Sequence, residues 1–446
     1  MMQQSHPVFL TLIAISLWLN STMDLAAKPP TKVRFATFNA SLNRSKSGKL
    51  QQDLESPSDP QARRIAEIIQ HVQPDVLLIN EFDFDPNGTA ADRFQENYLE
   101  ISQNGKQPIQ YPYRFLGPVN TGVPSGMDLN RDGQIAGPAD AFGFGNFPGQ
   151  YGMLVLSKYP IQADKIRTFQ KFLWRDMPGA KQPRNPEGSL FYSKKTMQRL
   201  RLSSKSHWDI PIQLDRGTIH FLVAHPTPPV FDGNEDRNGC RNHDEIRLLA
   251  DYVTPAESHY LVDDQGQSGG LQQDALFVIA GDMNADPHDG DSMQQAVQQL
   301  TKHPLIHQNV VPTSLGGQQA AAQGQANQQH SGKPAHDTAD FPDKVPGNLR
   351  VDYVLPSKTL QPLAAGVFWP NAELQRAKLI KASDHRLVWL DVVNIAPRRS
   401  RMPLQARFHR SVANSPEASA LFLSYLDLPS FQTGKGSPIN SAIKFQ

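Results

Sequence analysis

The apolar positions of this chain fall into short runs that are separated by long polar loops. Runs with the length of buried strands cover residues 33–38, 76–79, 151–157, 218–224, 275–280, 350–355 and 387–392. Between them, residues 61–71 carry apolar side chains at helical spacing, and residues 242–252 and 292–299 are further helical stretches. This alternation predicts an α/β protein whose strands pack in layers.

A separate apolar run, residues 8–19, lies near the N-terminus. It is short for a membrane span, and the small residues Leu25-Ala26-Ala27 follow it. These features are typical of a secretory signal peptide over residues 1–27, and the alternative is a buried helix at the start of the fold. We therefore expect a secreted or periplasmic protein that has no integral membrane segment after processing, with its folded domain over residues 28–393.

Three segments interrupt the pattern inside this domain. Residues 120–150 are rich in Gly, Pro and Asp and are too long for an ordinary connection, which favours a functional role. Residues 316–335 are of low complexity and predict a mobile loop. Residues 165–206 form a third insertion, and residues 394–446 form a C-terminal tail whose sequence indicates no role.

The composition excludes several classes of protein. The chain has 446 residues, of which 39% are apolar, and its net charge is +1, so it does not bind polyanions over its whole surface. A mean hydropathy of −0.48 excludes a polytopic membrane protein. The single cysteine, Cys240, excludes an internal disulfide framework and a multi-cysteine metal site, and we expect it to be a bystander.

Polar side chains that can bind metals or transfer protons accompany six of the strand-like runs. They are Asn39, Glu81, His225, Asp282 with Asn284, Asp352, and Asp384 with His385. Such a group beside a buried strand is costly unless it is paired, hydrogen-bonded or metal-bound. One of them could be a turn former, but six are hard to explain in that way. Because open α/β sheets place their sites at strand ends, the pattern predicts one shared active site.

The ordered motifs TFNA, INEF, GQYG, VAHP, GDMN, RVDY and SDHR resemble those of the endonuclease/exonuclease/phosphatase superfamily. The resemblance covers about residues 32–393 and implies an α/β (α+β) fold, a four-layer α/β-sandwich of two packed β-sheets flanked by helices. It also implies a metal-dependent phosphoric ester hydrolase whose site lies at one end of the sandwich.

The same resemblance assigns the metal ligands. Asn39 and Glu81 are expected to bind a divalent ion, Mg²⁺ or else Mn²⁺ or Ca²⁺, and Asp384 is expected to help. Tyr151 lies where some members place a tyrosine that contacts the phosphate.

The resemblance also assigns the catalytic groups. Asp282 would orient or deprotonate the attacking water, and Asn284 would position Asp282 and contact the phosphoryl oxygens. His385 would contact the phosphate with Asp352 as its carboxylate partner, and His225 would lie near the leaving group. These residue types suit phosphate-ester hydrolysis independently, because that reaction needs charge neutralisation and an aligned water.

Residues 128–135, DLNRDGQI, copy the first eight positions of an EF-hand calcium loop. The candidate calcium ligands are Asp128, Asn130, Asp132, Gln134 and Asp140. Position 12 of the loop, normally Glu, is Ala139, so the alternative is a polar glycine turn. A second oxygen-rich run, residues 232–239, either binds a metal or shapes the rim of the site. Side chains in the same stretch could instead grip the substrate: Arg237, Arg241, Asn242 and His243.

The charge is unevenly distributed along the chain. Residues 165–206 hold eleven Lys and Arg and two acids, and this net +9 leaves −8 on the remainder because the whole chain carries +1. The insertion either contacts polyanions or is a solvated surface segment. Aromatic side chains within or beside it could form a rim: Phe172, Trp174, Phe191, Tyr192 and Trp208.

These observations leave several functions open. The first is a secreted, monomeric phosphoesterase that acts on small or extracellular phosphate monoesters or diesters. The second is a secreted nuclease that uses the same residues on DNA, and a sphingomyelinase-like phosphodiesterase is a further alternative. A binding protein that kept the fold but lost turnover is disfavoured, since every expected catalytic position is filled.

Overall fold

The computed structural model describes residues 32–293 and 295–393. The predicted signal peptide and C-terminal tail lie outside these residues. Within them, no helix is long and apolar enough to cross a membrane.

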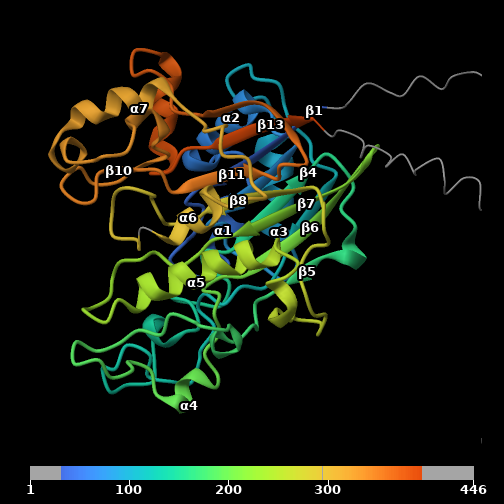
Figure 1. Ribbon diagram of the computed structural model, residues 1–446. Helices are drawn as coiled ribbons and strands as arrows, with labels where there is room; N and C mark the ends of the chain where they lie inside the picture. Colours follow the sequence, from blue (N-terminus) through green and yellow to red (C-terminus); the bar gives the residue numbers. More distant parts are fainter. Residues whose placement is uncertain (1–31, 294, 394–446) are drawn as a thin grey trace, which may run out of the picture. The chain divides into compact units, whose positions relative to one another are not determined.

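Two mixed β-sheets form the centre of the fold (Figure 1). The six-stranded sheet has the order β12-β13-β1-β2-β4-β3, with β1 Lys32–Asn39, β2 Val76–Asn80, β3 Tyr113–Leu116, β4 Met153–Ser157, β12 Gln361–Val367 and β13 Val388–Val393. The five-stranded sheet has the order β11-β8-β7-β6-β5, with β5 Arg167–Thr168, β6 His207–Leu214, β7 Gly217–Ala224, β8 Phe277–Asp282 and β11 Asp352–Pro356. A short ribbon pairs β9 Ala339–Asp340 with β10 Asn348–Leu349.

Helices cover the outer faces of both sheets, as the resemblance implied. The six-stranded sheet packs against α1 Lys49–Asp53, α2 Pro60–Val72 and α3 Thr89–Phe94, and the five-stranded sheet packs against α5 Arg237–Tyr252 and α6 Gln295–Thr301. Helices α4 Lys194–Met197 and α7 Leu315–Ala320 lie in insertions. Single turns or short 3-10 and π segments are η1 Gln95–Leu99, η2 Pro138–Asp140, η3 Ala163–Lys165, η4 Trp174–Asp176, η5 Ser258–Tyr260, η6 Ala321–Gln323, η7 Gln325–Gln328, η8 Pro334–His336 and η9 Gln375–Ala382.

Strand β1 shows how the sequence builds these layers. Val33 and Phe35 pack between the sheets, whereas Ala36 and Phe38 pack beneath the helices. Phe35 contacts Phe221 of β7 across the sandwich, with ring centroids 5.3 Å apart. Because both faces of the strand are buried from Phe35 onward, apolar side chains occur there at odd and even positions alike, whereas the charged Lys32 and Arg34 lie at its start.

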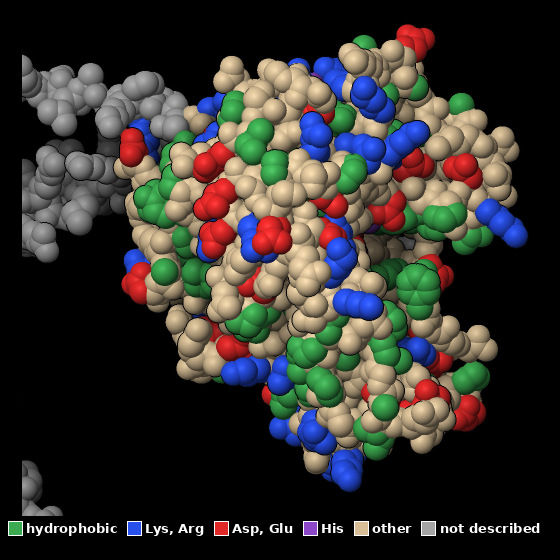
Figure 2. Space-filling model, turned by 180° about the vertical axis from the view of Figure 1, so that it is seen from behind, with side chains coloured by type: hydrophobic (Ala, Val, Ile, Leu, Met, Phe, Trp, Pro, Cys, Tyr) green, Lys and Arg blue, Asp and Glu red, His purple; other side chains and the backbone are tan. Residues whose placement is uncertain are grey.

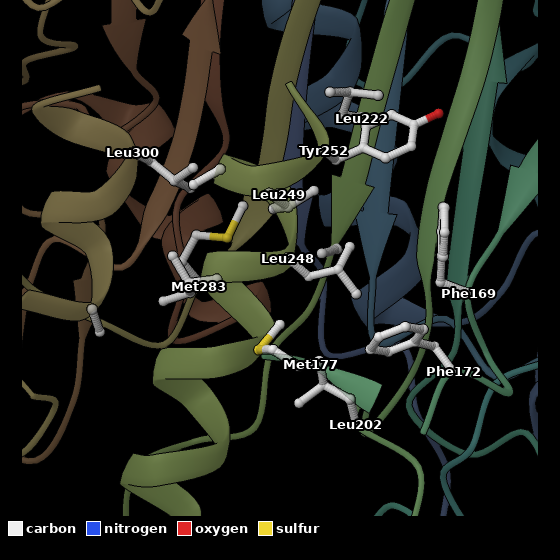
Figure 3. Close-up of a cluster of buried hydrophobic side chains, with 14 of the residues drawn as sticks. Phe169, Phe172, Met177, Leu202, Leu222, Leu248, Leu249, Tyr252, Met283 and Leu300 are labelled. Carbon is white, nitrogen blue, oxygen red and sulfur yellow. The ribbon is translucent and has the colours of Figure 1, made fainter. Parts of the chain in front are cut away.

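A third core cluster lies between α5 and the five-stranded sheet (Figure 3). Leu248 and Leu249 of α5 lie in it with Leu222 of β7. Aromatic side chains within or beside residues 165–206, the basic insertion, are part of the interior and not of a rim: Phe172, Trp174, Phe191 and Trp208 are buried, and Tyr192 is partly buried against the same core. The expectation of an aromatic rim is therefore wrong, because these large apolar rings gain more from burial than from exposure.

The low-complexity segment 316–335 differs from the predicted featureless loop. It lies in helix α7 and the short 3-10 segments η6, η7 and η8. Ala and Gln are good helix formers, and the Ser314 hydroxyl caps α7 by accepting a hydrogen bond from the Gly317 N–H at 3.0 Å. The strand expected at residues 151–157 begins at Met153, because Tyr151 adopts a left-handed backbone conformation with φ of 55°.

Asp391 of β13 anchors the neighbouring strand β1. It accepts hydrogen bonds from Arg34 Nε at 2.6 Å and Arg34 Nη2 at 2.9 Å, and from Lys32 Nζ at 3.2 Å. Burial alone would raise the pKa of Asp391, but the Arg34 and Lys32 contacts outweigh it and hold the pKa below its ordinary value of 3.8. This ion pair therefore stabilises the fold above about pH 3.8, and its contribution falls as the pH drops further and the carboxylate becomes protonated.

We expect Asp391→Asn to lower the free energy of unfolding by about 2 kcal/mol at pH 7, since it removes the charge from a buried, hydrogen-bonded pair. The difference from the wild type should shrink at pH 3. Urea denaturation at both pH values measures it, and a difference that is equal at both would contradict the assignment.

Candidate active site

The strand ends of both sheets bring the predicted site residues to one end of the sandwich. Strands β1 and β2 are parallel and so are β7 and β8, so their carboxyl ends lie together within each sheet. Strands β13 and β11 run antiparallel to them and begin where they end. As a result, Asp352 at the start of β11 lies directly opposite Asp282 at the end of β8.

A hydrogen bond joins the two sheets at this end. The Asn39 amide at the end of β1 donates to Asp282 Oδ2 at 3.0 Å. The other oxygen, Asp282 Oδ1, accepts the backbone N–H of Asn284 at 2.9 Å. Asp282 is 1% exposed, so its carboxylate is held by protein groups on both oxygens.

Two buried histidines flank the same carboxylate. The Nδ1 atom of His385 lies 2.9 Å from Asp352 Oδ2, and its Nε2 atom lies 3.6 Å from Asp282 Oδ2. The Nε2 atom of His225 lies 3.4 Å from the same oxygen of Asp282. The Nδ1 atom of His225 and Oδ1 of Asp352 have no hydrogen-bond partner among the described residues.

The electrostatic environment gives the two histidines opposite charge states. Burial would lower the pKa of His385, but the carboxylates of Asp352 and Asp282 raise it to about 10. Burial lowers the pKa of His225 well below its ordinary value, and the positive charges of Lys205 and His385 lower it further. At neutral pH, His385 is therefore an imidazolium and His225 is a neutral imidazole.

Site residues also adopt a costly backbone conformation. Glu81, Tyr151 and Asn284 have positive φ angles of 59°, 55° and 50°. A non-glycine residue in this region costs about 1–3 kcal/mol and persists only where the surrounding structure imposes it. Such residues cluster at functional sites, and here they turn the chain sharply beside three strand ends.

Comparison with known families gives the identity of this arrangement. The Endonuclease/Exonuclease/phosphatase family matches residues 36–385. The chain belongs to this family. Members of the family are metal-dependent phosphoesterases, so the protein is a metal-dependent phosphoric ester hydrolase, and the fold expected from the sequence is confirmed.

Solved structures of family members resemble the chain at low sequence identity. A family protein from Beutenbergia cavernae is 16% identical with a TM-score of 0.44, and the match covers 81% of this chain and 71% of that one. Beta toxin from Staphylococcus aureus is 14% identical with a TM-score of 0.40, covering 80% and 99%. Sphingomyelinase C from Streptomyces griseocarneus is 14% identical with a TM-score of 0.39, covering 81% and 99%. A comparison with curated proteins finds no match.

The donor groups at the site fit the divalent ion that the family requires. Burial raises the pKa of Glu81, so its carboxylate would be stabilised by a nearby cation, and Asn39 lies within hydrogen-bonding reach of it. Asp384 is exposed and accepts a hydrogen bond from the Ser41 hydroxyl at 3.4 Å. Among residues 32–293 and 295–393, the only His, Cys, Asp or Glu side chains close enough to share an ion in a group of three are Asp282, Asp352 and His385.

Two charged residues of the site escaped the sequence analysis. Lys205 is 6% exposed and stands two residues before β6, which runs antiparallel to β7 and so begins beside His225. Burial lowers the pKa of Lys205, and the negative charges of Glu245, Glu81 and Asp282 oppose this shift. Asp83 accepts hydrogen bonds from the backbone N–H groups of Arg44 at 2.8 Å and Tyr151 at 3.1 Å. Its pKa is raised to about 7 by burial.

The candidate calcium loop, residues 128–135, folds as a polar turn. Asp128, Asn130 and Asp132 accept hydrogen bonds from backbone N–H groups within the loop. Asp140 is buried and accepts from the N–H groups of Leu129 and Ala136 at 2.8 and 2.9 Å. These contacts leave calcium binding by this loop, including Gln134, as a prediction.

Polar residues in the stretch after His225 have a structural role. Arg241 donates to the carbonyls of Leu202 and Phe142, and Asn242 donates to those of Thr227 and Met283 at 2.9 Å. These contacts tie the loops around the site together, so the alternative that both residues grip the substrate is not favoured.

The single cysteine lies away from this chemistry. Cys240 is in the hydrophobic cluster under α5, and burial raises the pKa of its thiol to about 12. A thiolate is therefore strongly disfavoured there, in keeping with the expected bystander role.

Proposed function

We propose that this chain is a secreted, monomeric phosphoesterase that hydrolyses phosphate monoesters or diesters by in-line attack of water. The observation that carries the proposal is the buried group in which the Asp282 carboxylate lies within 3.6 Å of both His385 Nε2 and His225 Nε2. The Asp282 carboxylate lies between the cationic His385 and the neutral His225. It can accept a proton while His385 faces a phosphoryl oxygen.

Each side chain has a defined task in this reaction. Asp282 accepts a proton from the attacking water, and the backbone N–H of Asn284 fixes its orientation. His385 donates a hydrogen bond to the phosphoryl oxygen, and Asp352 keeps it protonated. His225 lies near the leaving group, and Tyr151 contacts the phosphate.

The metal has its own ligands in this proposal. Asn39 and Glu81 would hold Mg²⁺, Mn²⁺ or Ca²⁺, with Asp384 as a further ligand. When bound, the ion would neutralise negative charge on the phosphoryl oxygens. The nearby amine of Lys205 is buried, and the negative charges of Glu245, Glu81 and Asp282 favour its ammonium form against the effect of burial on its pKa.

Surface features bear on the two alternatives. Figure 2 shows acidic and basic side chains interspersed over one face of the molecule, and a nuclease groove on that face would need basic residues along its length. The basic insertion also buries part of its charge, since Arg167 pairs with Asp263 at 2.6 Å and Lys205 is buried. The lipid alternative is supported by large apolar side chains that are exposed on loops: Ile135, Phe144, Leu190 and Phe231.

A substrate panel tests the proposal. The chain without residues 1–27 is assayed with Mg²⁺, Mn²⁺ or Ca²⁺ against p-nitrophenyl phosphate, its bis-ester, plasmid DNA and sphingomyelin. We expect turnover of a small ester that falls to background with a chelator and returns when the metal is restored. Plasmid cleavage far faster than ester hydrolysis, with a steep loss in salt, would favour the nuclease. No turnover of any substrate would refute the proposed activity.

A further inference from the structure

A cavity of about 730 Å³ opens beside the catalytic group. Ser383 and Asp384 line it, and they belong to the same turn as His385. The Ser383 hydroxyl accepts the backbone N–H of His385 at 3.0 Å and donates to the Asn39 carbonyl at 2.7 Å. The cavity therefore adjoins the proposed phosphate site through this turn: Ser383 and Asp384 line the cavity, whereas His385 contacts Asp352 and does not line it. A substrate that extends from His385 past Asp384 would reach the cavity.

Segments outside the catalytic motifs form the rest of the cavity. Gln319 and Gln323 come from α7 and η6, which fold from the low-complexity insertion. Lys378 and Lys381 come from η9, and Trp369 lies after β12. The volume is within the range of about 300–1,000 Å³ typical of small-molecule sites. The insertion therefore contributes a wall to a site of ligand size.

The charges of this cavity are unevenly compensated. Asp340 pairs with Arg386 at 2.7 Å, and the Arg386 guanidinium stacks on the Trp369 ring at 4.3 Å. Lys378 and Lys381 are exposed, and neither forms an ion pair with another residue in the described ranges 32–293 and 295–393. The two lysines thus present positive charge on the cavity lining, and this charge exceeds that of the exposed Asp384 carboxylate on the same lining, which is itself a proposed metal ligand.

We propose that this cavity binds a second phosphate group of the substrate, with Lys378 and Lys381 as its main contacts. The inference rests on the proposed phosphoesterase function, which places the scissile phosphate at His385. A second phosphate can come from a small bisphosphate or from the next phosphodiester of a nucleic-acid strand. Both carry the anionic oxygens that an ammonium group binds.

Calorimetric titration in Mg²⁺ tests the inference without relying on turnover. The full chain carries Asp282→Asn to prevent hydrolysis, and two matched ligand pairs are compared: fructose 6-phosphate with fructose 1,6-bisphosphate, and thymidine 5′-monophosphate with the dinucleotide pTpT. We expect the ligand with two phosphates to bind about tenfold more tightly in at least one pair, as two ammonium contacts allow. The pair that shows the advantage identifies the source of the second phosphate.

A double variant then assigns the advantage to the cavity. Lys378→Gln with Lys381→Gln should remove it while leaving the affinity for the monophosphates unchanged. The matched control is Lys302→Gln with Lys358→Gln, two exposed lysines that do not line this cavity and whose loss should leave the advantage intact. Equal affinities in both pairs of the parent chain, or an advantage that survives the loss of Lys378 and Lys381, would overturn the inference. Failure of the substrate panel would instead refute the proposed function.

Discussion

Replacing Asp282 by alanine is expected to lower kcat by about 10³- to 10⁴-fold. The carboxylate is the group between the two histidines, at 3.4 Å from His225 Nε2 and 3.6 Å from His385 Nε2, so its loss removes the proposed proton acceptor. The fold should survive. Burial raises the pKa of Asp282 to about 6, opposed by the positive charge of His385, so the group is still a carboxylate at neutral pH. Its loss also leaves the buried Asn39 amide and the Asn284 N–H without their acceptor, so the thermal midpoint should fall by a few degrees while the unfolding transition stays cooperative.

The matched control for this variant lies at the other end of the same strand. Asp274 is exposed and precedes β8, so Asp274→Ala removes one carboxylate without touching the site. Its kcat should stay near the wild-type value. Retained activity in Asp282→Ala, measured on the ester that the wild type hydrolyses best, would contradict the role of Asp282.

Replacing Gly281 by alanine is expected to lower the free energy of unfolding by about 4 kcal/mol or more. A methyl group at this position would lie 2.0 Å from the Ala224 carbonyl oxygen on the neighbouring strand β7. The atom that the methyl group would meet belongs to the backbone of a paired strand, so a flexible side chain cannot relieve the contact. Gly281 also has φ of 154°, which alanine rarely adopts. Urea denaturation of the purified variant measures the loss.

Gly266 provides the comparison that separates conformational strain from contact. Its φ is 89°, and a methyl group there would meet nothing within 4 Å. Gly266→Ala should therefore cost only about 1–2 kcal/mol for the left-handed conformation. If both variants lose the same stability, the close approach of β7 and β8 is not what requires a glycine at position 281.

The strand-end reasoning predicted the catalytic part of the site well. The apolar runs before Asn39, His225 and Asp282 are β-strands, and their ends meet because the strand pairs β1–β2 and β7–β8 are parallel. The adjacency of Asp352 and Asp282 follows from the antiparallel register of β11 and β8. Spacing along the chain cannot provide that register, so the resemblance was needed to connect His385 with Asp352.

The insertions were predicted poorly, and the reason is physical. Their net charge and aromatic content were read as surface properties, although Trp174 and Phe172 pack into the core beneath α5. Lys205 belongs to the segment whose charge suggests either polyanion contacts or a solvated surface, yet it is buried beside His225. A segment without helical or strand periodicity carries no signal for the side that faces inward, so its burial depends on tertiary contacts that a single sequence does not specify.

The bond from Asn39 to Asp282 connects two sheets whose facing sides also pack through a cluster of apolar side chains. The spacing of the sheets, which contacts such as Phe35 with Phe221 maintain, therefore also sets the distance between the proposed metal ligands of one sheet and the proton acceptor of the other. The hydrophobic core therefore helps to set the geometry of the active site. A substitution in the core between the sheets that preserves stability but changes side-chain volume would therefore alter the alignment of water and phosphate without touching either of them.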